Sequence, residues 1–328
     1  MKTIVSFFGE RTAIFEQLNR QAEEYAGKAG FAYKWIPLNP FSPEEAVRHL
    51  STADIGIIDI EPYGEAIFSR IFHSCKLLIR FGVGYDKVDL SSASKYGIAV
   101  ARTTGANTLG VAEMAFSLIM AARRKLKYFD HAVGQKNWGK VIVHETIQST
   151  IGVVGFGAIG RALIKLFRGW DCDIITYDPN PDKKALEELG VRLVSLEELF
   201  KIADAISLHL PYTPDTHHLI GEKLLYSMKP GAVIVNTSRG NIIVEDVLAR
   251  AVREGRICGA GMDVFAEEPL PADSPLTGLD NLTLTPHVSS QTAESLWRIY
   301  QMAVDIASSF EAGKNSPHIL NPDYKNKT

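Results

Sequence analysis

Short apolar segments alternate with amphipathic segments along the first hundred residues. Each apolar segment is short and bounded by polar or turn-forming residues, which is typical of buried strands. A helical pattern covers Ala13–Ala29, and Ser42-Pro43-Glu44-Glu45 combines a capping box with proline at the first helical position. This alternation predicts a parallel sheet with helices on both faces. Its strands are expected at Thr3–Phe7, Tyr33–Ile36, Ile55–Ile58, Leu77–Ile79 and Ile98–Val100.

A long apolar helical pattern over Thr108–Leu126 interrupts this alternation, and its apolar density predicts burial on several sides. Residues 127–148 show no regular pattern and are expected to be irregular. A second series of strands and helices runs from Thr150 to Pro286, and a last helix is expected over Thr292–Ala312. A chain of 328 residues with two such series predicts an α/β fold of two doubly wound parallel-sheet domains. The strands of the second series are expected at Ile151–Val154, Ile174–Tyr177, Arg192–Val194, Ala205–Leu210, Ala232–Asn236, Cys258–Met262 and Leu282–Leu284.

Composition narrows the classes of partner. A mean hydropathy near zero is typical of a soluble globular protein, and a net charge of -3 argues against nucleic acid. The basic run Arg123-Arg124-Lys125 follows an apolar helical pattern, so a helix C-terminus explains it better than a binding patch. No segment approaches the roughly 18 apolar residues of a membrane span, and the apolar run at the N-terminus is too short for a signal peptide.

The cysteines bear on metal binding and on the cellular compartment. Cys75, Cys172 and Cys258 are far apart, and none has the spacing of a zinc or redox pair. We therefore expect no metal site, buried thiols and a reducing cytoplasm.

The sharpest local motif is Gly155-Phe156-Gly157-Ala158-Ile159-Gly160, which joins a predicted strand to a predicted helix. In a GxGxxG turn the first glycine permits the tight turn, the second lets backbone approach a pyrophosphate, and the third lets helix and strand pack closely. The helix N-terminus then offers N–H groups and a positive dipole end to a phosphate. A glycine-rich turn alone is a weak signal, but the flanking strand and helix make a dinucleotide site the better interpretation.

Asp178 follows the next predicted strand, which is where dinucleotide-binding folds place an acid. A carboxylate there accepts hydrogen bonds from the adenosine ribose and repels a 2′-phosphate, so it favours NAD over NADP. The alternative is that Asp178 only opens the turn with Pro179.

Three residues whose side chains could take part in a reaction follow strands of the second series. They are Arg239, Glu268 and His287. Alone, each has an ordinary explanation as a surface charge, a solvated loop or a structural histidine. Function in a doubly wound sheet lies beyond the carboxyl ends of its strands, however, and all three are predicted there. A guanidinium binds a carboxylate or carbonyl oxygen, a histidine exchanges protons near neutral pH, and a carboxylate beside it favours the imidazolium form.

With these residues in view, the sequence resembles the D-isomer-specific 2-hydroxyacid dehydrogenase family along nearly its whole length. The resemblance implies a flavodoxin-like substrate domain over residues 1–103 plus 290–328, and an inserted Rossmann NAD domain over 104–289. The matching stretches are Arg80–Asp89, Asn107–Glu113, Gly155–Gly160, Asn236–Gly240, Asp263–Pro269 and Pro286–His287.

The resemblance also implies roles. NAD would exchange a hydride with C2 of a small 2-hydroxy or 2-oxo acid. Arg239 would bind and polarise that substrate, His287 would act as acid and base, and Glu268 would be its partner. Substrate binding would further involve Arg80 and the backbone N–H groups of Val83 and Gly84. Cofactor contacts would come from Thr108, Gly155, Gly157, Ala158, Ile159, Gly160, Asp178, Thr237, Ser238, Asp263 and Ser290, with Asp263 on the nicotinamide carboxamide.

The resemblance further implies a homodimer formed through the NAD domain, with residues 127–148 as an arm. Two departures from the family pattern bear on the substrate. Members that use 3-phosphoglycerate often carry a basic residue where this chain has Asp59-Ile60-Glu61-Pro62-Tyr63, and the chain as given holds no regulatory extension before residue 328. An unphosphorylated acid is therefore expected, with selectivity in Ile60–Tyr63, Phe8-Gly9, Val83 and Trp138.

Other functions remain open at this stage. A 3-phosphoglycerate dehydrogenase is one alternative within the family. Formate or phosphite oxidation is another, although Glu268 stands where formate oxidation typically has glutamine. A corepressor-like protein that senses NAD without catalysis is the alternative from a different class, and the presence of Arg239, Glu268 and His287 argues against it.

Overall fold

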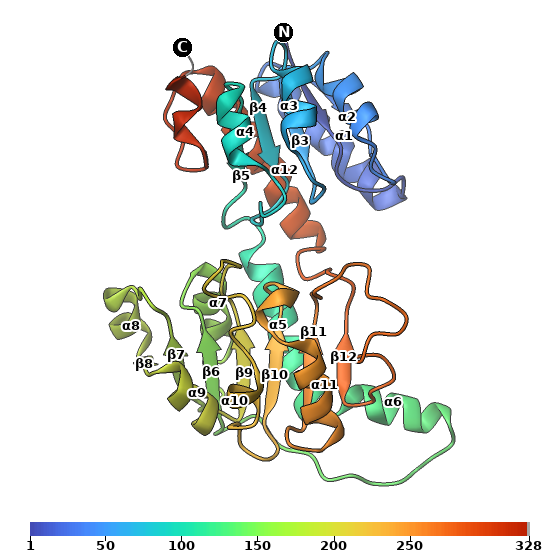
Figure 1. The fold of residues 1–328 in the computed structure, drawn as a ribbon, viewed down its shortest axis with the longest axis vertical. Coiled ribbons are helices and arrows are strands. Elements are labelled where there is room, and N and C mark those ends of the chain that lie inside the picture. Colours follow the sequence, from blue (N-terminus) through green and yellow to red (C-terminus); the bar gives the residue numbers. More distant parts are fainter. Residues whose placement is uncertain (327–328) are drawn as a thin grey trace. The chain divides into compact units, whose positions relative to one another are not determined.

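The computed structural model describes residues 1–326 and divides the chain into two compact units, each built on its own parallel sheet (Figure 1). Unit 1 comprises Met1–Asn107 and Gln291–Thr328, and unit 2 comprises Thr108–Ser290. The chain thus leaves unit 1 after residue 107 rather than 103, and returns after residue 290 rather than 289. Two doubly wound parallel sheets confirm the predicted fold class.

Unit 1 contains a sheet of five parallel strands in the order β2-β1-β3-β4-β5. This is the flavodoxin-like order, which reverses between β1 and β3. The carboxyl ends of these two strands and of β4 therefore form the edge at which such a sheet binds ligands. The strands are β1 (Lys2–Ser6), β2 (Phe31–Trp35), β3 (Ile55–Ile58), β4 (Leu77–Arg80) and β5 (Ala99–Arg102).

Helices cover both faces of this sheet, so alternate strand residues enter two separate cores. Ile55 and Ile57 pack on the face covered by α1 (Ala13–Lys28) and α12 (Ala293–Glu311). Ile58 packs on the other face. Burial on both faces explains why these strands read as continuous apolar runs. The second face is covered by α2 (Pro43–Leu50), α3 (Glu65–Ile71) and α4 (Leu90–Lys95).

Unit 2 contains seven parallel strands in the order β12-β11-β10-β9-β6-β7-β8. The order reverses at β6, whose neighbours are β7 on one side and β9 on the other. The strands are β6 (Thr150–Val154), β7 (Asp173–Tyr177), β8 (Arg192–Leu193), β9 (Ala205–Leu208), β10 (Val233–Asn236), β11 (Gly259–Met262) and β12 (Leu282–Leu284).

Close helix packing in unit 2 depends on small residues in its strands. A Cβ at Gly261 of β11 would lie 2.7 Å from Cβ of Leu118, so α5 (Thr108–Arg123) fits against this strand only because the residue is glycine. The predicted burial of this helix is confirmed, because Ala115, Leu118 and Ile119 are almost fully buried. One face carries α5, α7 (Ala158–Leu166) and α8 (Lys183–Leu189), and the other carries α9 (Leu196–Ile202), α10 (Glu222–Leu225) and α11 (Glu245–Arg253).

The expectation that residues 127–148 are irregular is wrong for their first part. The long helix ends at Arg123, Lys125 adopts a left-handed conformation with φ 50°, and a separate helix α6 follows over Leu126–Gly134. Lys127 attaches α6 to the body of the unit, donating to the carbonyls of Leu279 and Leu282 at 3.0 and 2.9 Å. The helix buries only Ala132, so it lacks the apolar stripe against its own core that would have signalled it.

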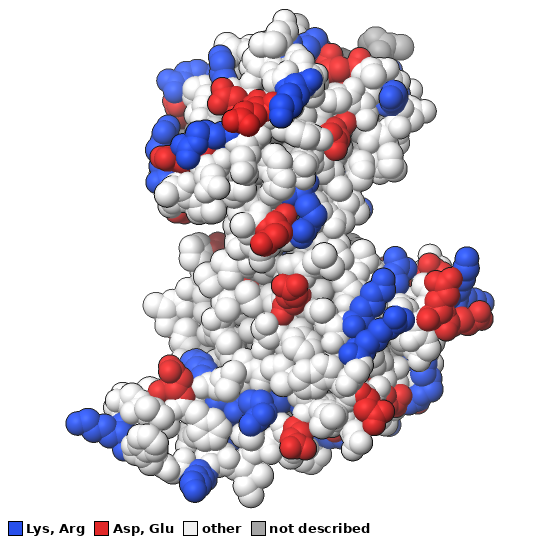
Figure 2. Space-filling view, turned by 180° about the vertical axis from the view of Figure 1, so that it is seen from behind, with Lys and Arg blue, Asp and Glu red and all other residues white. Residues whose placement is uncertain are grey.

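Charged side chains of both signs are interspersed over the surface of each unit seen in Figure 2. Within residues 1–326, no helix combines the length and the apolar character needed to cross a membrane.

Candidate functional site

The glycine loop between β6 and α7 contains two glycines that the protein itself requires. Gly155 has φ +103°, and a Cβ there would lie 2.7 Å from the carbonyl oxygen of His209. A Cβ at Gly160 would lie 2.2 Å from the carbonyl oxygen of Gly155. These two glycines therefore let the strand, the turn and the helix come together.

Gly157 is different, because nothing in the protein requires it to be glycine. Its φ is −71°, and no atom lies within 4 Å of the position a Cβ would take. It is the N-cap of α7 and supplies no side-chain cap to the N–H groups of the first turn, and Gly157 and Ala158 are both exposed. This arrangement fits a pyrophosphate, which needs close backbone approach and free N–H groups at a helix N-terminus.

Asp178 lies beside the glycine loop and holds it. Its Oδ2 accepts a hydrogen bond from the N–H of Phe156 at 2.7 Å, and its Oδ1 accepts one from the N–H of Asn180 at 2.8 Å. Asp178 therefore does open the local turn, as the alternative interpretation held. A carboxylate has about four acceptor positions, so these two bonds leave acceptors for ribose hydroxyls.

The three candidate reacting residues come from three neighbouring strands. Asn236 of β10, Met262 of β11 and Leu284 of β12 stand side by side in the register of the sheet. Arg239, Glu268 and His287 follow these positions in the loops at the carboxyl ends of the strands. The sheet thus brings together residues that are up to 48 positions apart in the sequence (287 − 239).

Backbone contact between two of these loops determines where their side chains lie. A Cβ at Gly240 would lie 1.8 Å from the carbonyl carbon of Phe265 and 2.2 Å from the nitrogen of Ala266. The loop that carries Arg239 therefore lies directly against the loop that carries Glu268, and any side chain at residue 240 would separate them. Sequence reasoning named Arg239 but missed the role of the glycine that follows it.

Glu268 and His287 form a hydrogen-bonded pair. Glu268 Oε2 lies 2.8 Å from His287 Nδ1, and Glu268 Oε1 accepts a hydrogen bond from the N–H of Phe265 at 3.0 Å. Burial raises the pKa of Glu268, but its hydrogen bond and charge interaction with His287, the Phe265 N–H and the charge of Arg239 together outweigh burial and lower that pKa below its usual value. The carboxylate is therefore ionised at neutral pH. With Nδ1 facing Glu268, the ring presents Nε2 for proton exchange.

Asn236 fixes the turn before Arg239. Its Nδ2 donates to the carbonyl oxygen of Arg239 at 2.8 Å, and its Oδ1 accepts from the N–H and the hydroxyl of Ser238 at 3.0 and 2.7 Å. The side chain of Arg239 is half-buried, and its Nη1 donates to the Ser238 carbonyl at 2.6 Å. The hydroxyl, the N–H and the carbonyl of Ser238 thus all take part in hydrogen bonds within the protein.

Two buried polar atoms at this edge have no partner among the described residues. One is Oγ1 of Thr237, which was predicted to contact the cofactor, and the other is Nδ1 of His209. His209 follows β9 at the reversal of strand order, and its Nε2 lies 2.9 Å from Oγ of Ser207. Burial lowers the pKa of His209 to about 4, so the ring is neutral. Sequence reasoning missed His209, although its place after a strand at the reversal point was a usable signal.

The remaining predicted cofactor residues lie in contrasting surroundings. Thr108 begins α5 and Ser290 ends unit 2, so both stand where the chain passes from one unit to the other. Asp263, by contrast, is 0% exposed, and its carboxylate accepts hydrogen bonds from Thr285, Val288 and Ser289.

In unit 1, the segment after β4 presents two adjacent backbone donors. Among residues 1–326, the N–H groups of Val83 and Gly84 meet no acceptor. Gly82 precedes them with φ +127°, and its N–H donates to the hydroxyl of Thr103 at 2.9 Å. Successive N–H groups at such a turn form a concave donor site that suits a carboxylate.

The charged residues near this segment, Arg80 and Glu61, have different electrostatic surroundings. Arg80 is 7% exposed and donates through Nη1 to the carbonyl of Phe81, 3.7 Å from Oδ1 of Asp59, so its charge is neutralised inside unit 1. Burial and the neighbouring Asp59 raise the pKa of the Glu61 carboxyl above its usual value. Tyr63 is only 1% exposed and belongs to the core beneath α2 and α3, so the expectation that it contributes to substrate selectivity is wrong.

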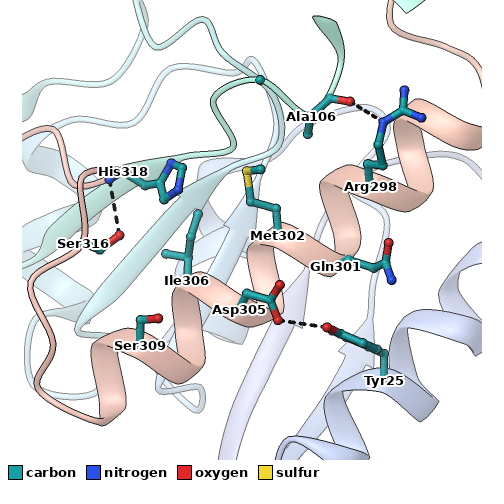
Figure 3. Close-up of a pocket in the computed structure, with 11 residues that line it drawn as sticks. Tyr25, Ala106, Arg298, Gln301, Met302, Asp305, Ile306, Ser309, Ser316 and His318 are labelled. Atoms are coloured by element: carbon teal, nitrogen blue, oxygen red, sulfur yellow. Dashed lines mark hydrogen bonds between the residues drawn. The ribbon is translucent and has the colours of Figure 1, made fainter. Parts of the chain in front are cut away.

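A hollow of about 480 Å³ lies elsewhere in unit 1, on α12 (Figure 3). Asp305 accepts a hydrogen bond from the Tyr25 hydroxyl at 3.0 Å, and Arg298 Nε donates to the carbonyl of Ala106 at 2.9 Å. Both charged side chains thus have structural partners. Within the described part of the chain, no group of three or more His, Cys, Asp or Glu side chains is arranged to hold a metal ion.

Comparison with known proteins agrees with this geometry. Residues 116–289 match the model of the D-isomer specific 2-hydroxyacid dehydrogenase NAD binding domain. The chain is 38% identical over 255 residues to a glyoxylate reductase of Korarchaeum cryptofilum, covering 76% of both chains. It is 32% identical over 287 residues to a D-3-phosphoglycerate dehydrogenase of Archaeoglobus fulgidus, covering 87% of this chain and 54% of the relative.

A solved structure of D-2-hydroxyisocaproate dehydrogenase superposes with a TM-score of 0.86 at 26% identity, covering 98% of this chain and 100% of the other. The matched domain spans more than half of the chain, and the relatives exceed 30% identity over most of it. The chain therefore belongs to the D-isomer specific 2-hydroxyacid dehydrogenase family and is an NAD-dependent oxidoreductase of that family.

Proposed function

We propose that this protein reduces a small, unphosphorylated 2-oxo acid of the glyoxylate type to the D-2-hydroxy acid. The observation that carries the proposal is the pairing of Glu268 with His287 at 2.8 Å, next to the loop of Arg239, in the sheet that also holds the glycine loop. A proton donor, a cation and a dinucleotide site are what the reduction of a carbonyl beside a carboxylate requires.

The reaction divides between residues of known position. Arg239 binds the substrate and polarises its carbonyl oxygen, as a guanidinium does by directed N–H donors. His287 gives a proton from Nε2 to that oxygen, while Glu268 at Nδ1 stabilises the imidazolium and fixes the ring. NAD, when bound in its reduced form, supplies the hydride.

For the cofactor, we propose three groups of contacts. The N–H groups of the α7 N-terminus, with Gly157 at its cap, bind the pyrophosphate, and Asp178 binds the adenosine ribose. Thr237, whose buried hydroxyl has no partner among the described residues, donates to the nicotinamide half, and Thr108, Ser238 and Ser290 line the same half.

For the substrate, we propose that the N–H groups of Val83 and Gly84 hold the carboxylate. We propose that Arg80 stabilises that segment through its ion pair with Asp59 and does not contact the substrate. The carboxyl group of Glu61, which follows β3, disfavours a phosphorylated acid because like charges repel, whereas the charge of Asp59 is paired with Arg80. The glyoxylate reductases among the relatives point in the same direction.

For the assembly, we propose a cytoplasmic homodimer formed through unit 2. Among residues 1–326, eleven large apolar side chains are exposed, and six of them belong to residues 126–147: Leu126, Val133, Trp138, Val141, Ile142 and Ile147. A hollow of about 400 Å³ lies among them, lined in part by Phe129, Val133 and Trp138. Exposed apolar side chains concentrated in one segment are typical of an interface. The three cysteines are all free, which is typical of a reducing compartment.

We expect the purified protein to oxidise NADH with glyoxylate, pyruvate, hydroxypyruvate or 2-oxoisocaproate. Its kcat/KM with the best of these acids should be at least about tenfold higher than with 3-phosphohydroxypyruvate. One unfavourable charge interaction of about 1.4 kcal/mol gives that ratio. Steady-state kinetics over the five acids measures this. Best turnover with the phosphorylated acid would move the assignment to the phosphoglycerate branch. No turnover with any acid, alongside intact NADH binding, would favour the sensor alternative.

The same assay tests the roles of the reacting residues. His287→Ala should lower kcat about a hundredfold or more while NADH still binds, because only proton transfer is removed. Arg239→Ala should raise KM and lower kcat together, because the guanidinium acts on substrate and transition state alike. Wild-type turnover in either variant contradicts the role proposed for that residue.

The glycine loop predicts different outcomes for two similar substitutions. Gly157→Ala should leave the melting temperature unchanged, because the added Cβ meets no atom of the protein. It should weaken NADH binding by about tenfold or more, because the methyl group occupies the space through which the pyrophosphate approaches the backbone. Gly160→Ala should lower the melting temperature, because its Cβ meets the Gly155 carbonyl. Thermal melts and NADH fluorescence titrations measure both, and unaltered NADH affinity in Gly157→Ala contradicts the predicted pyrophosphate site.

The lowered pKa of Glu268 predicts a pH effect. Its carboxylate is charged above this pKa and loses that charge only as the pH falls through it, so at neutral pH it favours the imidazolium that reduction needs. Glu268→Gln removes the charge, and the pH above which reduction declines should move down by about one unit or more. The matched control is Glu267→Gln, an exposed neighbour, which should leave the profile in place. An unmoved profile in Glu268→Gln counts against the pairing.

The exposed segment predicts a change of mass. The double variant Trp138→Ser, Ile142→Ser should convert the protein from twice the chain mass of 36.1 kDa to the single chain, because it removes the two most exposed apolar side chains of the segment. Light scattering after size-exclusion chromatography measures this. Ile14→Ser, an exposed apolar position on α1, is the control and should not alter the mass. A wild-type protein that is already monomeric contradicts the dimer.

A further inference from the structure

The turn after β4 lies against the end of the neighbouring strand β5, which forms one edge of the unit 1 sheet (Figure 1). Arg102, the last residue of β5, and Thr103, which follows it, bond to two consecutive peptide groups of this turn. The N–H groups of the same two peptides belong to Val83 and Gly84 and meet no acceptor among residues 1–326. The end of β5 therefore holds the carbonyl side of the two peptides whose N–H groups are proposed to bind the substrate carboxylate.

The first of these peptides joins Gly82 to Val83. Its carbonyl oxygen accepts hydrogen bonds from the N–H of Thr103 at 3.1 Å and from the Thr103 hydroxyl at 3.3 Å. The N–H of Gly82 donates in turn to that hydroxyl at 2.9 Å. In a planar trans peptide the C=O and the N–H point in opposite directions. The bonds to Thr103 therefore direct the N–H of Val83 away from β5.

The second peptide joins Val83 to Gly84, and here the contact comes from a side chain. Nη1 of Arg102 donates to the carbonyl oxygen of Val83 at 3.4 Å. The guanidinium lies over the ring of Tyr85, 5.2 Å from the ring centroid, so a cation–π contact also holds it in place. Within the described part of the chain, no carboxylate forms an ion pair with Arg102. Its charge is thus not neutralised by an acid and acts on this peptide.

A charged donor at a carbonyl affects the N–H of the same peptide in two ways. It fixes the plane of the peptide, and the N–H must then point to the side opposite the donor. It also polarises the peptide, because hydrogen bonds in a chain strengthen one another and an ionised donor gives the stronger bond. Arg102 therefore orients the N–H of Gly84 and makes it a better donor to an anion.

We infer that Arg102 is a positioning residue for the substrate carboxylate, acting through the peptide between Val83 and Gly84 rather than by contact with the substrate. The bond from the N–H of Thr103 is made by backbone, which almost any residue supplies, whereas the contact made by Arg102 depends on its side chain. The inference rests on the proposed function for the carboxylate site itself. It assigns part of the affinity for the substrate to a cation on the far side of the peptide.

The substitution Arg102→Met keeps an unbranched apolar side chain and removes both the donor and the charge. We expect KM for glyoxylate to rise by about tenfold, the effect of one charge-assisted hydrogen bond, while the Kd for NADH stays within about twofold. The kcat should also stay within about twofold, because the carboxylate is bound alike in the ground state and the transition state. An unchanged KM, or a loss in kcat as large as the rise in KM, overturns the inference.

A second cation of the same segment separates orientation from net charge. Lys87 is exposed and lies a little further along the turn, so Lys87→Met removes one positive charge without touching the peptide between Val83 and Gly84. It should change KM by less than about twofold. An equal rise of KM in Lys87→Met and Arg102→Met shows that charge alone acts, which contradicts the positioning role.

The choice of substrate separates action through the peptide from direct contact. Glyoxylate, pyruvate and 2-oxoisocaproate share the carboxylate and differ only in the group on the carbonyl carbon. The factor by which Arg102→Met raises KM should therefore be the same for all three acids. A factor that changes with that group indicates that Arg102 contacts the substrate itself, and the inference is then wrong.

Variants of Tyr85 keep the test available if Arg102→Met does not fold. Tyr85→Phe keeps the ring beneath the guanidinium and should leave KM unchanged. Tyr85→Leu removes the ring and should raise KM by about two- to fivefold, the effect of one cation–π contact, with the Kd for NADH unchanged. Equal KM values for the two variants overturn the inference.

One readout does not depend on turnover. Oxamate carries the same carboxylate beside an amide and accepts no hydride, and its binding to the complex of protein and NADH is measured by NADH fluorescence. The Kd for oxamate should rise in Arg102→Met by about the same factor as KM, and an unaltered Kd counts against the inference. A wild-type protein that neither reduces a 2-oxo acid nor binds oxamate contradicts the proposed function instead, so the two failures are distinguishable.

Discussion

The site depends on how closely three loops can approach at one edge of a parallel sheet. Gly240 lies against the backbone of Phe265 and Ala266 with no room for a Cβ, and this contact sets the loop of Arg239 against that of Glu268. The loop of His287 is joined to the same place by the hydrogen bonds of Asp263. A glycine and a buried carboxylate thus determine where the side chains of Arg239, Glu268 and His287 lie. The geometry is carried by rigid backbone contacts rather than by the long side chains themselves.

Much of this arrangement is predictable because parallel strands obey simple rules. Apolar runs of four or five residues mark the strands, and their carboxyl ends share one edge, so Arg239, Glu268 and His287 were expected near one another. The glycine loop was equally predictable from the sequence, since Gly155, Gly157 and Gly160 have the fixed spacing of a dinucleotide-binding turn between a strand and a helix. The fold class followed from the same alternation of segments.

What the sequence does not reveal is how each residue uses its neighbours. Tyr63 looks like a surface residue of the substrate edge but lies in the core, because burial depends on tertiary packing and not on local pattern. Arg80 was expected to bind substrate, and its sequence position does not show that Asp59 lies 3.7 Å from it inside unit 1. Helix α6 escaped prediction because its apolar side chains do not face its own core. In each case the missing information is the identity of a contact partner distant in sequence.

Gly157 and His287 are both residues whose type is not explained by local packing or backbone conformation. Gly155 and Gly160 are required by the protein, since side chains there would meet its own backbone, whereas Gly157 faces open space. A glycine that packing does not require, at the N-terminus of a helix, is best explained by a ligand that must approach the backbone. His287 is the converse, a residue with a bulky side chain held at φ +54°, where glycine would be easier. A protein keeps such a local mismatch where the side chain is needed for function and the surroundings enforce the conformation, and at His287 those surroundings include the backbone carbonyl of Asp263, which accepts the N–H of His287 at 2.8 Å.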